Sequence, residues 1–114
     1  MRLRTTVGTG LGAVALALAL AAPAAAATGT FSYLYESHMG PQIGVLEDPP
    51  SRECLTLPEA ADPIDQPPAH TPRNRTDATA AVFSGPDCTG AHFSMRPFTG
   101  YGTERLKVRS VVFS

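Results

Sequence analysis

The chain has few of the side chains from which catalytic and metal sites are usually built. Its 114 residues contain two cysteines and no tryptophan, and the three histidines, His38, His70 and His92, are far apart in sequence. No H-E-x-x-H or G-x-S-x-G sequence occurs, so neither a zinc site of ordinary spacing nor a serine nucleophile on a strand-to-helix turn is indicated. We therefore predict that the protein is not an enzyme and carries no metal ion and no cofactor.

The chain also lacks a strong excess of one charge. Residues 28–70 carry seven acidic side chains and one basic one, whereas residues 71–114 carry six basic and three acidic ones, which leaves a balance of −3. A dedicated nucleic-acid-binding protein usually has a basic patch with interleaved aromatic residues, so nucleic acid is not an expected partner. The simplest interpretation is that the two halves attract each other in the fold. A charged surface for a polar partner is the alternative.

Residues 1–27 have the pattern of a secretory signal peptide. A basic start at Arg2 and Arg4 precedes an almost unbroken run of Leu, Ala, Val and Gly over residues 7–22, and small residues follow up to Ala27. This order of segments is typical of export signals. Cleavage after Ala27 satisfies the A-x-A rule, and cleavage after Ala26 satisfies it nearly as well. An uncleaved membrane anchor is the alternative, because the apolar run approaches the roughly 20 residues that span a bilayer. We predict a secreted, extracellular protein whose mature part lies off the membrane.

The remaining residues, 28–114, are enough for a single small domain. A chain of this length buries only about 60 to 65% of its unfolded surface, so a covalent crosslink matters for its stability. Both cysteines, Cys54 and Cys88, lie in this exported part, and two cysteines outside the cell predict one disulfide. On the chain-entropy model, closing a loop of about 35 residues stabilises the fold by roughly 3 to 4 kcal/mol. A free or intermolecular thiol is the alternative.

The stretch FSGPDCTGAHF, residues 83–93, brings an acid, a thiol and an imidazole close together in sequence. These residue types form nucleophilic sites, but they also fit a tight turn between two strands. If Cys88 is part of a disulfide, the thiolate that would act as nucleophile does not exist. Asp87 then caps amides of the turn, and His92 lies on the surface of the next strand. We expect the stretch to be scaffolding with no catalytic residue.

Alternating apolar residues and turn formers predict a chain made of short strands. Phe31, Tyr33 and Tyr35 share one face of a period-two segment, which is typical of a strand with its aromatic face toward a core. A turn over residues 37–41 then predicts a hairpin. The expected strands cover residues 30–36, 43–47, 53–57, 77–83, 91–95 and 105–113, with a bend or bulge near Arg109 in the last one. No segment shows a sustained helical period.

The segment from Pro58 to Pro72 has a different composition. Seven prolines fall between Pro49 and Pro72, and proline has no amide hydrogen to donate to a β-ladder. We therefore predict an extended, irregular crossover over residues 58–72 with one helical turn at most. A Greek key requires such a crossover in a strand-rich chain. The predicted fold is all-β, a small antiparallel Greek-key β-sandwich of six or seven strands with one disulfide.

Part of the second half resembles one Greek-key motif of the βγ-crystallin superfamily. The resemblance covers about residues 78–113 and depends on Phe83, Gly90 and Ser110, which match the opening aromatic residue, the motif glycine and the serine that leads the last strand. Cys88 stands where the motif has its second aromatic residue. The resemblance implies a sandwich of Greek-key motifs. It leaves open whether the first half of the chain is a degenerate second copy.

Some members of this superfamily bind calcium through an Asn or Asp that precedes paired hydroxyl residues in the last strand. Here Leu106 or Lys107 occupies the acidic position, and Val111 follows Ser110 in place of a second hydroxyl residue. A cationic side chain repels the ion, and too few oxygen atoms remain for the six to eight ligands that calcium takes. We predict that the domain binds no calcium.

Two functions fit these expectations. The first is a secreted, non-catalytic β-domain with a binding or structural role, acting as a monomer on an unknown extracellular protein or cell-surface component. The second is a proteinase inhibitor. Some exported metalloproteinase inhibitors of soil bacteria have a βγ-crystallin-like fold, and a disulfide-held, proline-stiffened loop suits inhibition. The loops to test are Pro58 to Pro72 and Gly85 to His92.

Overall fold

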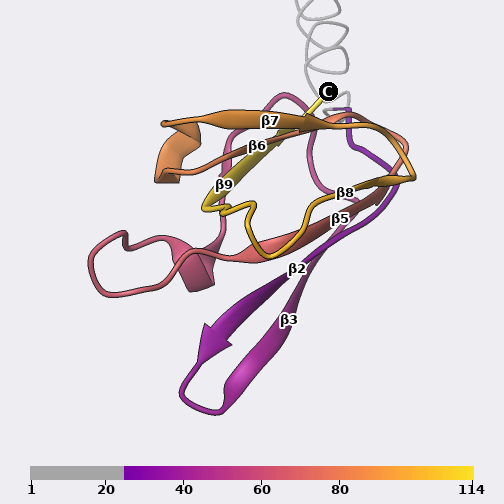
Figure 1. Cartoon of the computed structure of the whole chain (residues 1–114). Coiled ribbons are helices and arrows are strands. Elements are labelled where there is room, and N and C mark those ends of the chain that lie inside the picture. The colour runs from indigo at the N-terminus through magenta and orange to yellow at the C-terminus, as the bar shows by residue number, and fades with distance from the viewer. Residues whose placement is uncertain (1–24) are drawn as a thin grey trace, which may run out of the picture.

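The computed structural model describes residues 25–114, and in this range the chain folds into eight strands and two short 3-10 turns (Figure 1). The strands are β2 (Gly29–Ser37), β3 (Gly40–Glu47), β4 (Leu55–Thr56), β5 (His70–Thr76), β6 (Ala80–Phe83), β7 (His92–Met95), β8 (Gly100–Tyr101) and β9 (Ser110–Phe113), and the 3-10 turns are η1 (Pro58–Ala60) and η2 (Pro86–Cys88). The strands form two four-stranded sheets. The predicted all-β, sandwich-like structure is confirmed for this part of the chain.

Each half of the chain supplies four strands in the same arrangement. The sheets have the strand orders β3-β2-β5-β8 and β4-β9-β6-β7, and all pairs are antiparallel. The first strand of each half lies between the second and the fourth: β2 lies between β3 and β5, and β6 lies between β7 and β9. The third strand of each half pairs with the fourth strand of the other half, so β4 pairs with β9 and β8 pairs with β5. The two halves therefore cannot separate without opening both sheets.

The hydrophobic core lies between the two sheets. Phe31 of β2 and Phe113 of β9 are both buried, and their rings meet edge to face with centroids 5.4 Å apart. Burying one such side chain contributes roughly 1.5 to 3 kcal/mol. Tyr33 is also buried and Tyr35 packs against the core from its edge. The predicted strand with its aromatic face toward a core is therefore confirmed.

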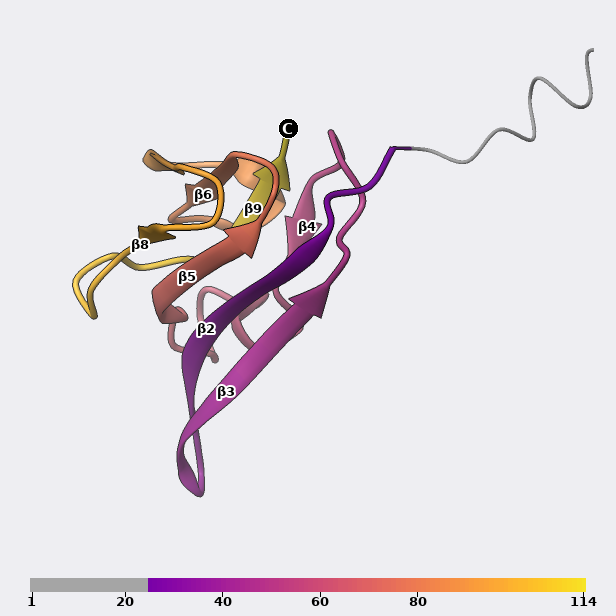
Figure 2. The same ribbon diagram turned by 90° about the vertical axis from the view of Figure 1, so that its right-hand side faces the viewer.

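The β2–β3 hairpin extends beyond the rest of the molecule (Figures 1 and 2). Its cross-strand pairs run without interruption from Thr30 opposite Glu47 to Ser37 opposite Gly40, which confirms the predicted hairpin. Gly44 lies opposite Tyr33, and a Cβ atom on it would be 2.3 Å from the tyrosine ring. Only glycine therefore lets the ring lie across the neighbouring strand.

Strand β5 lies where the sequence indicated no strand. The irregular crossover expected over 58–72 ends at Ala69, and His70–Thr76 occupies an interior position of the first sheet. The segment HTPRNRT is polar, so no apolar alternation signals a strand. Its inward side chains are Pro72, Asn74 and Thr76, and the hydroxyl of Thr76 donates to Asn74 Oδ1 at 2.7 Å. A polar residue can face a core when its hydrogen bonds are made inside it.

The end of the chain also differs from the expected long strand over 105–113. Strand β9 covers only Ser110–Phe113, and Val108 is joined to Ala69 by an isolated bridge. The change in side-chain alternation expected near Arg109 falls just before β9 begins. Val108, Arg109 and Ser110 are all buried, so the side chains do not alternate between core and surface at this point. Short β8 lies in a segment expected to be turn only. The described part thus holds eight strands where six or seven were expected.

Of the export signal predicted over residues 1–27, only the last three positions belong to the described residues. Ala27 is buried in the core, and its amide donates to the carbonyl of Pro49 at 2.8 Å. The amide of Ser51 donates to the carbonyl of Ala25 at 3.0 Å. Within residues 25–114, the structure contains no helix long and apolar enough to cross a membrane.

Candidate binding sites

The two cysteines form the predicted disulfide. Cys54 and Cys88 are bonded to each other with their Cα atoms 6.0 Å apart. The bond ties the start of edge strand β4 to η2, so it joins a strand of the first half to a turn of the second. A bridged cysteine offers no thiolate, and the FSGPDCTGAHF stretch therefore contains no cysteine nucleophile.

Ser110 holds the turn that carries Cys88. Its hydroxyl donates to the carbonyl of Gly85 at 2.7 Å and accepts the amide hydrogen of Cys88 at 2.8 Å. Gly90 has a φ of +83°, and a Cβ atom on it would lie 2.4 Å from Ser84 Oγ, so the turn needs glycine there. Two of the three residues that carry the family resemblance thus hold this turn together.

The acid and the imidazole of the same stretch contact separate neighbours. Asp87 accepts a hydrogen bond from Thr56 Oγ1 at 3.3 Å, and its own amide donates to that oxygen at 3.0 Å. His92 is exposed on β7 beside the ring of Phe83, the third residue of the resemblance, with ring centroids 5.7 Å apart. Among the hydrogen bonds of residues 25–114, none joins Asp87, Cys88 and His92. Their contacts are those of a scaffold.

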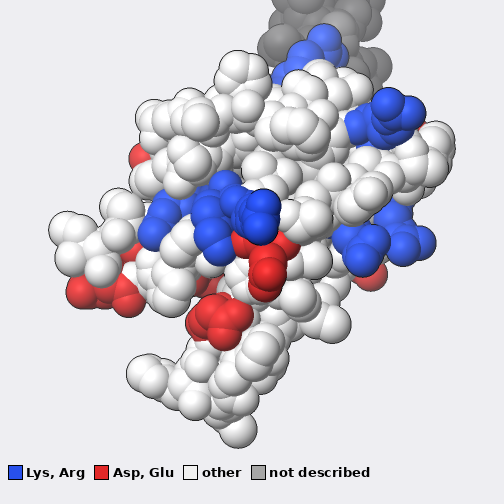
Figure 3. Space-filling view, viewed as in Figure 1, with Lys and Arg blue, Asp and Glu red and all other residues white. Residues whose placement is uncertain are grey.

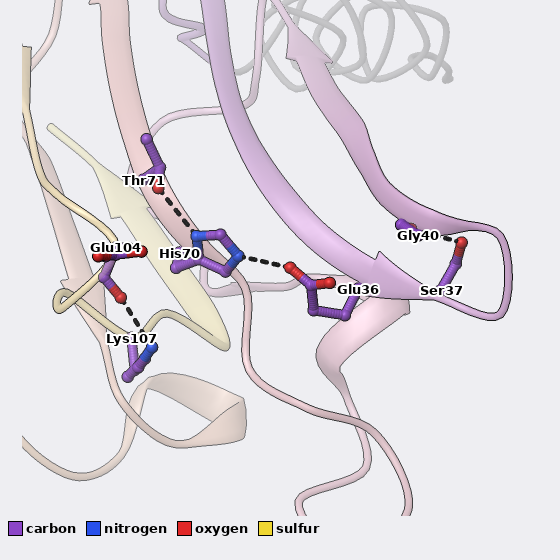
Figure 4. Close-up of polar contacts among 7 residues, drawn as sticks. All are labelled: Glu36, Ser37, Gly40, His70, Thr71, Glu104 and Lys107. Carbon is purple, nitrogen blue, oxygen red and sulfur yellow. Dashed lines mark hydrogen bonds and ion pairs between the residues drawn. The ribbon is translucent and has the colours of Figure 1, made fainter.

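The three histidines do not converge on one site. His70 Nε2 lies 3.0 Å from Glu36 Oε2, a contact that ties β5 to β2, and its Nδ1 lies 2.8 Å from Oγ1 of the adjacent Thr71 (Figure 4). His38 lies in the turn of the β2–β3 hairpin, and His92 lies on β7. Over the described range, no three His, Cys, Asp or Glu side chains are grouped so that they could hold a metal ion.

An acidic hollow of about 450 Å³ opens between the hairpin and the crossover. Its lining includes Glu36, Glu59 and Asp65 together with Tyr35. Beside it, the Tyr33 hydroxyl donates to Glu59 Oε1 at 2.7 Å. Burial, and then the neighbouring Glu59 carboxylate, raise the pKa of Tyr33 well above its ordinary value. Tyr33 is therefore a neutral donor that fixes one wall of the hollow.

The crossover loop presents an apolar side chain at a fixed tip. Ile64 is 89% exposed, and the amides of Ile64 and Asp65 donate to Asp62 Oδ1 at 2.9 and 3.2 Å. These two hydrogen bonds lower the pKa of Asp62. The loop is also anchored from below, because buried Arg109 donates from Nη1 to the carbonyls of Ala60 and Asp62 at 3.0 and 3.2 Å.

A second surface combines arginines with exposed aromatic rings. Arg73 and Arg75 lie on the outer face of β5, and Tyr101 of β8 pairs with Arg73 across the sheet. Together with Phe98 they line a hollow of about 280 Å³, and an adjoining hollow of about 400 Å³ shares Tyr101. We call the two hollows the basic aromatic trough, which is defined by Arg73, Arg75, Phe93, Arg96, Phe98 and Tyr101.

The arginines of the trough are not engaged by carboxylates. In residues 25–114 the His70–Glu36 contact is the one ion pair, so no direct Arg–carboxylate pair joins the acidic and basic halves there. Figure 3 shows the basic side chains in several separate groups over one face, with most acidic side chains below them. Within residues 25–114, no guanidinium group of the trough is therefore paired with a carboxylate.

The sequence indicated the disulfide and its turn, but neither the acidic hollow nor the trough. The trough is assembled from β5, β7, β8 and the β7–β8 loop, so no spacing along the chain reveals it. The available signal was the basic balance of residues 71–114 together with the phenylalanines and tyrosine among them. Comparison of the chain with protein-family models, with curated proteins and with solved structures finds no match.

Proposed function

We propose that the protein is a secreted, non-catalytic domain that binds an extracellular protein or a cell-surface component. The observation that carries this proposal is the Cys54–Cys88 disulfide in a small all-β domain. Such crosslinks persist in oxidising compartments outside the cytosol, and this one occupies the chain's two thiols. A binding role is supported by exposed Phe98 and Tyr101 beside arginines, since aromatic residues and arginine are enriched where proteins make contact.

The strand order supports a pair of Greek-key motifs of the βγ-crystallin kind. In a Greek key the fourth strand returns beside the first, which gives the spatial order 4-1-2-3. Both halves follow this order up to the third strand, as β5-β2-β3 and β9-β6-β7, and each third strand is exchanged into the opposite sheet. On this proposal, the first half of the chain is a second, degenerate copy of the Greek-key motif that the other half resembles.

The test is retention by material from outside the cell. The exported protein is immobilised and exposed to cell-wall fragments and to culture medium, and the bound components are quantified at increasing input. We expect saturable retention of one component by the native protein and none by protein that has been reduced, alkylated and unfolded. Equal retention by both forms, or turnover of the retained component, would overturn the proposal.

A proteinase inhibitor is the second candidate, and the fixed crossover loop favours it. A pre-organised loop loses little conformational entropy on binding, and Ile64 is the apolar anchor that such a loop would place in a protease pocket. Because the loop turns tightly around Asp62, Ile64 would enter the pocket as a plug and would not lie in the cleft like an extended substrate.

This candidate is tested with a panel of secreted metalloproteinases and serine proteinases. Ile64→Asp is compared with the matched control Ile43→Asp, because Ile43 is also exposed but lies on β3. Inhibition in the nanomolar range that falls at least about tenfold in the Ile64 variant alone would support it; one buried apolar anchor is commonly worth that much. Steady digestion of the native protein by every protease rules it out.

A further inference from the structure

The basic aromatic trough places donors for an oxyanion beside faces for an apolar ring. Arg73 and Arg75 project from the same face of β5, and each guanidinium offers a planar fork of N–H groups that matches a carboxylate or phosphate. Phe98 and Tyr101 line the same hollow, and each is 64% exposed. A sugar ring presents C–H bonds on its faces and hydroxyl or acidic groups at its rim. An acidic sugar therefore complements both parts of the hollow at once.

Phe98 is held in a conformation that disfavours its own side chain. Its φ is +65°, in the left-handed region where a bulky residue is an outlier and glycine is preferred. Its amide donates to the carbonyl of Thr76 at 2.9 Å, so the backbone is fixed there by β5. The ring nevertheless stays exposed and buries little surface in return. Strain kept without a packing gain is typical of a residue retained for binding.

The dimensions of the trough indicate a ligand of more than one unit. The hollow beside Arg73 and Arg75 measures about 280 Å³, and the adjoining one of about 400 Å³ continues past Tyr101 to Phe93 and Arg96. Ligand sites for small molecules usually measure about 300 to 1,000 Å³, so each hollow alone is near the lower limit. No Asp or Glu lines either hollow in the described structure. The pattern of cation and ring thus repeats along the trough.

We propose that the basic aromatic trough binds an acidic polysaccharide, with sugar rings stacked on Tyr101 and Phe98 and their oxyanions held by Arg73 and Arg75. This inference rests on the proposed function, because an extracellular binding domain meets such polymers at cell surfaces. It names the ligand class and the residues that would recognise it.

Single-stranded nucleic acid is the rival ligand, since bases also stack on aromatic rings and phosphates also bind arginine. One feature favours the sugar. The disulfide indicates a compartment outside the cytosol, where acidic polysaccharides are polymers of cell surfaces. Arg105 and Lys107 line a further hollow that shares Phe93 with the trough, so the cationic surface continues beyond it, and the oligothymidylate control decides between the two polymers.

Binding is measured on glycan arrays and by calorimetry with two matched pairs of polymers. Polygalacturonate is compared with neutral galactan, and phosphomannan with neutral mannan, at fixed ionic strength; single-stranded oligothymidylate is the polyanion control. We expect the exported protein to bind at least one acidic polymer and to bind its neutral counterpart at least tenfold more weakly. Equal or tighter binding of the oligothymidylate, or no binding of either acidic polymer, overturns the inference.

Three variants connect that binding to the trough. The Arg73→Gln/Arg75→Gln double variant should weaken binding at least tenfold. The control Arg105→Gln/Lys107→Gln removes the same charge from the neighbouring hollow that shares Phe93 with the trough, and it should change binding less than twofold. Phe98→Gly should lower affinity while keeping or raising Tm, because glycine accepts the positive φ. A loss of affinity accompanied by lower Tm in Phe98→Gly, or equal losses in both double variants, would contradict the assignment.

The outcome also separates this inference from the proposed function. If the native protein is retained by cell-wall material or by a component of the medium but ignores both acidic polymers, the trough assignment fails and the binding role stands. If nothing is retained and no polymer binds, both fail.

Discussion

At the scale of single residues, the protein keeps buried polar groups only where their hydrogen bonds are completed inside the fold. Asn74 is fully buried, and its Nδ2 donates to the carbonyls of Ala78, Met95 and Arg96 at 2.8, 3.3 and 3.0 Å. Its Oδ1 accepts from the amide and the hydroxyl of Thr76. Asn74 also begins an N-x-T sequence, but a side chain so enclosed is inaccessible to glycosylation in the folded protein.

Replacing Asn74 by aspartate should destabilise the protein strongly. The carboxylate would face three carbonyl oxygens without a hydrogen to donate, and leaving buried groups unsatisfied costs roughly 1 to 3 kcal/mol or more for a charged group. We expect urea denaturation at pH 7 to show a loss of about 3 kcal/mol for Asn74→Asp. Arg75→Gln, at the exposed neighbouring position, should stay within about 0.5 kcal/mol of the native protein. Similar stability of both variants would contradict the proposed network.

Tyr33 should make the fold sensitive to alkali. Its pKa is raised in the folded protein above the value of about 10 that tyrosine has in an unfolded chain, so the unfolded state loses its proton first. The stabilisation is complete below about pH 10 and is lost as the pH rises further. Phenolate absorbance from Tyr33 should therefore appear only as the protein unfolds.

Tyr33→Phe is the control for this titration, because it removes the ionisable group and keeps the ring. We expect its free energy of unfolding to fall less steeply above pH 10 than that of the native protein. If the two curves have the same slope, the shift of the Tyr33 pKa does not contribute to alkaline unfolding.

At the scale of elements, the fold depends on contacts that fasten its short or irregular segments. Strand β4 has two residues and pairs with β9 alone, so the disulfide beside it supplies a restraint that its ladder does not. In the described chain, the crossover that follows β4 contains one helical turn, η1. It is held in place by the hydrogen bonds of Arg109 and Asp62. The disulfide and the hydrogen bonds of Arg109 join the two halves of the chain, whereas the hydrogen bonds of Asp62 lie within the crossover loop.

Removing the disulfide should therefore loosen edge strand β4 and lower the free energy of unfolding of the whole protein. The bond closes a loop with a sequence separation of 34, which corresponds to about 3 to 4 kcal/mol on the chain-entropy model. We expect Cys54→Ser/Cys88→Ser to lose that amount in chemical denaturation. Reducing agent should shift the native protein by a similar amount and leave the double variant unchanged. A shift of the double variant by reducing agent would mean that another effect is being measured.

At the scale of the whole molecule, the folded part begins earlier than the A-x-A rule at Ala27 suggests. Ala27 is 2% exposed, its amide is bonded to Pro49, and Ala26 forms a bridge with Pro50. Cleavage after Ala27 would remove a side chain from the core and two backbone contacts from the sandwich. Ala22-Pro23-Ala24 also satisfies the A-x-A rule and would leave these contacts intact.

We therefore expect the exported protein to begin at Ala25. Intact mass and amino-terminal sequencing of protein collected outside the cell measure this directly. A chain that begins at Thr28 should be less stable than one that begins at Ala25 by about 2 to 3 kcal/mol, the cost of one buried methyl group and two backbone hydrogen bonds. An exported chain that begins at Thr28 and is equally stable would contradict the expectation.

Much of the fold followed from local pattern. The alternation of Phe31, Tyr33 and Tyr35 defined a strand, the glycine and proline turns divided the chain, and two cysteines allowed a single pairing. These features are local or unique, so they need no knowledge of which segments meet. The same local logic missed β5, because its inward residues Asn74 and Thr76 are polar and their partners are supplied by other segments.

The sequence by itself determined most of the strand-forming segments, the disulfide partners and the uneven distribution of charge. Tertiary structure decided the exchange of β4 and β8 between the sheets, the burial of Ala27 and the meeting of Arg73, Phe98 and Tyr101 in one trough. The physical reason is that periodicity and turn chemistry act between neighbours in the chain. Strand exchange and surface composition depend on which distant segments pack together, and no short-range signal encodes that choice.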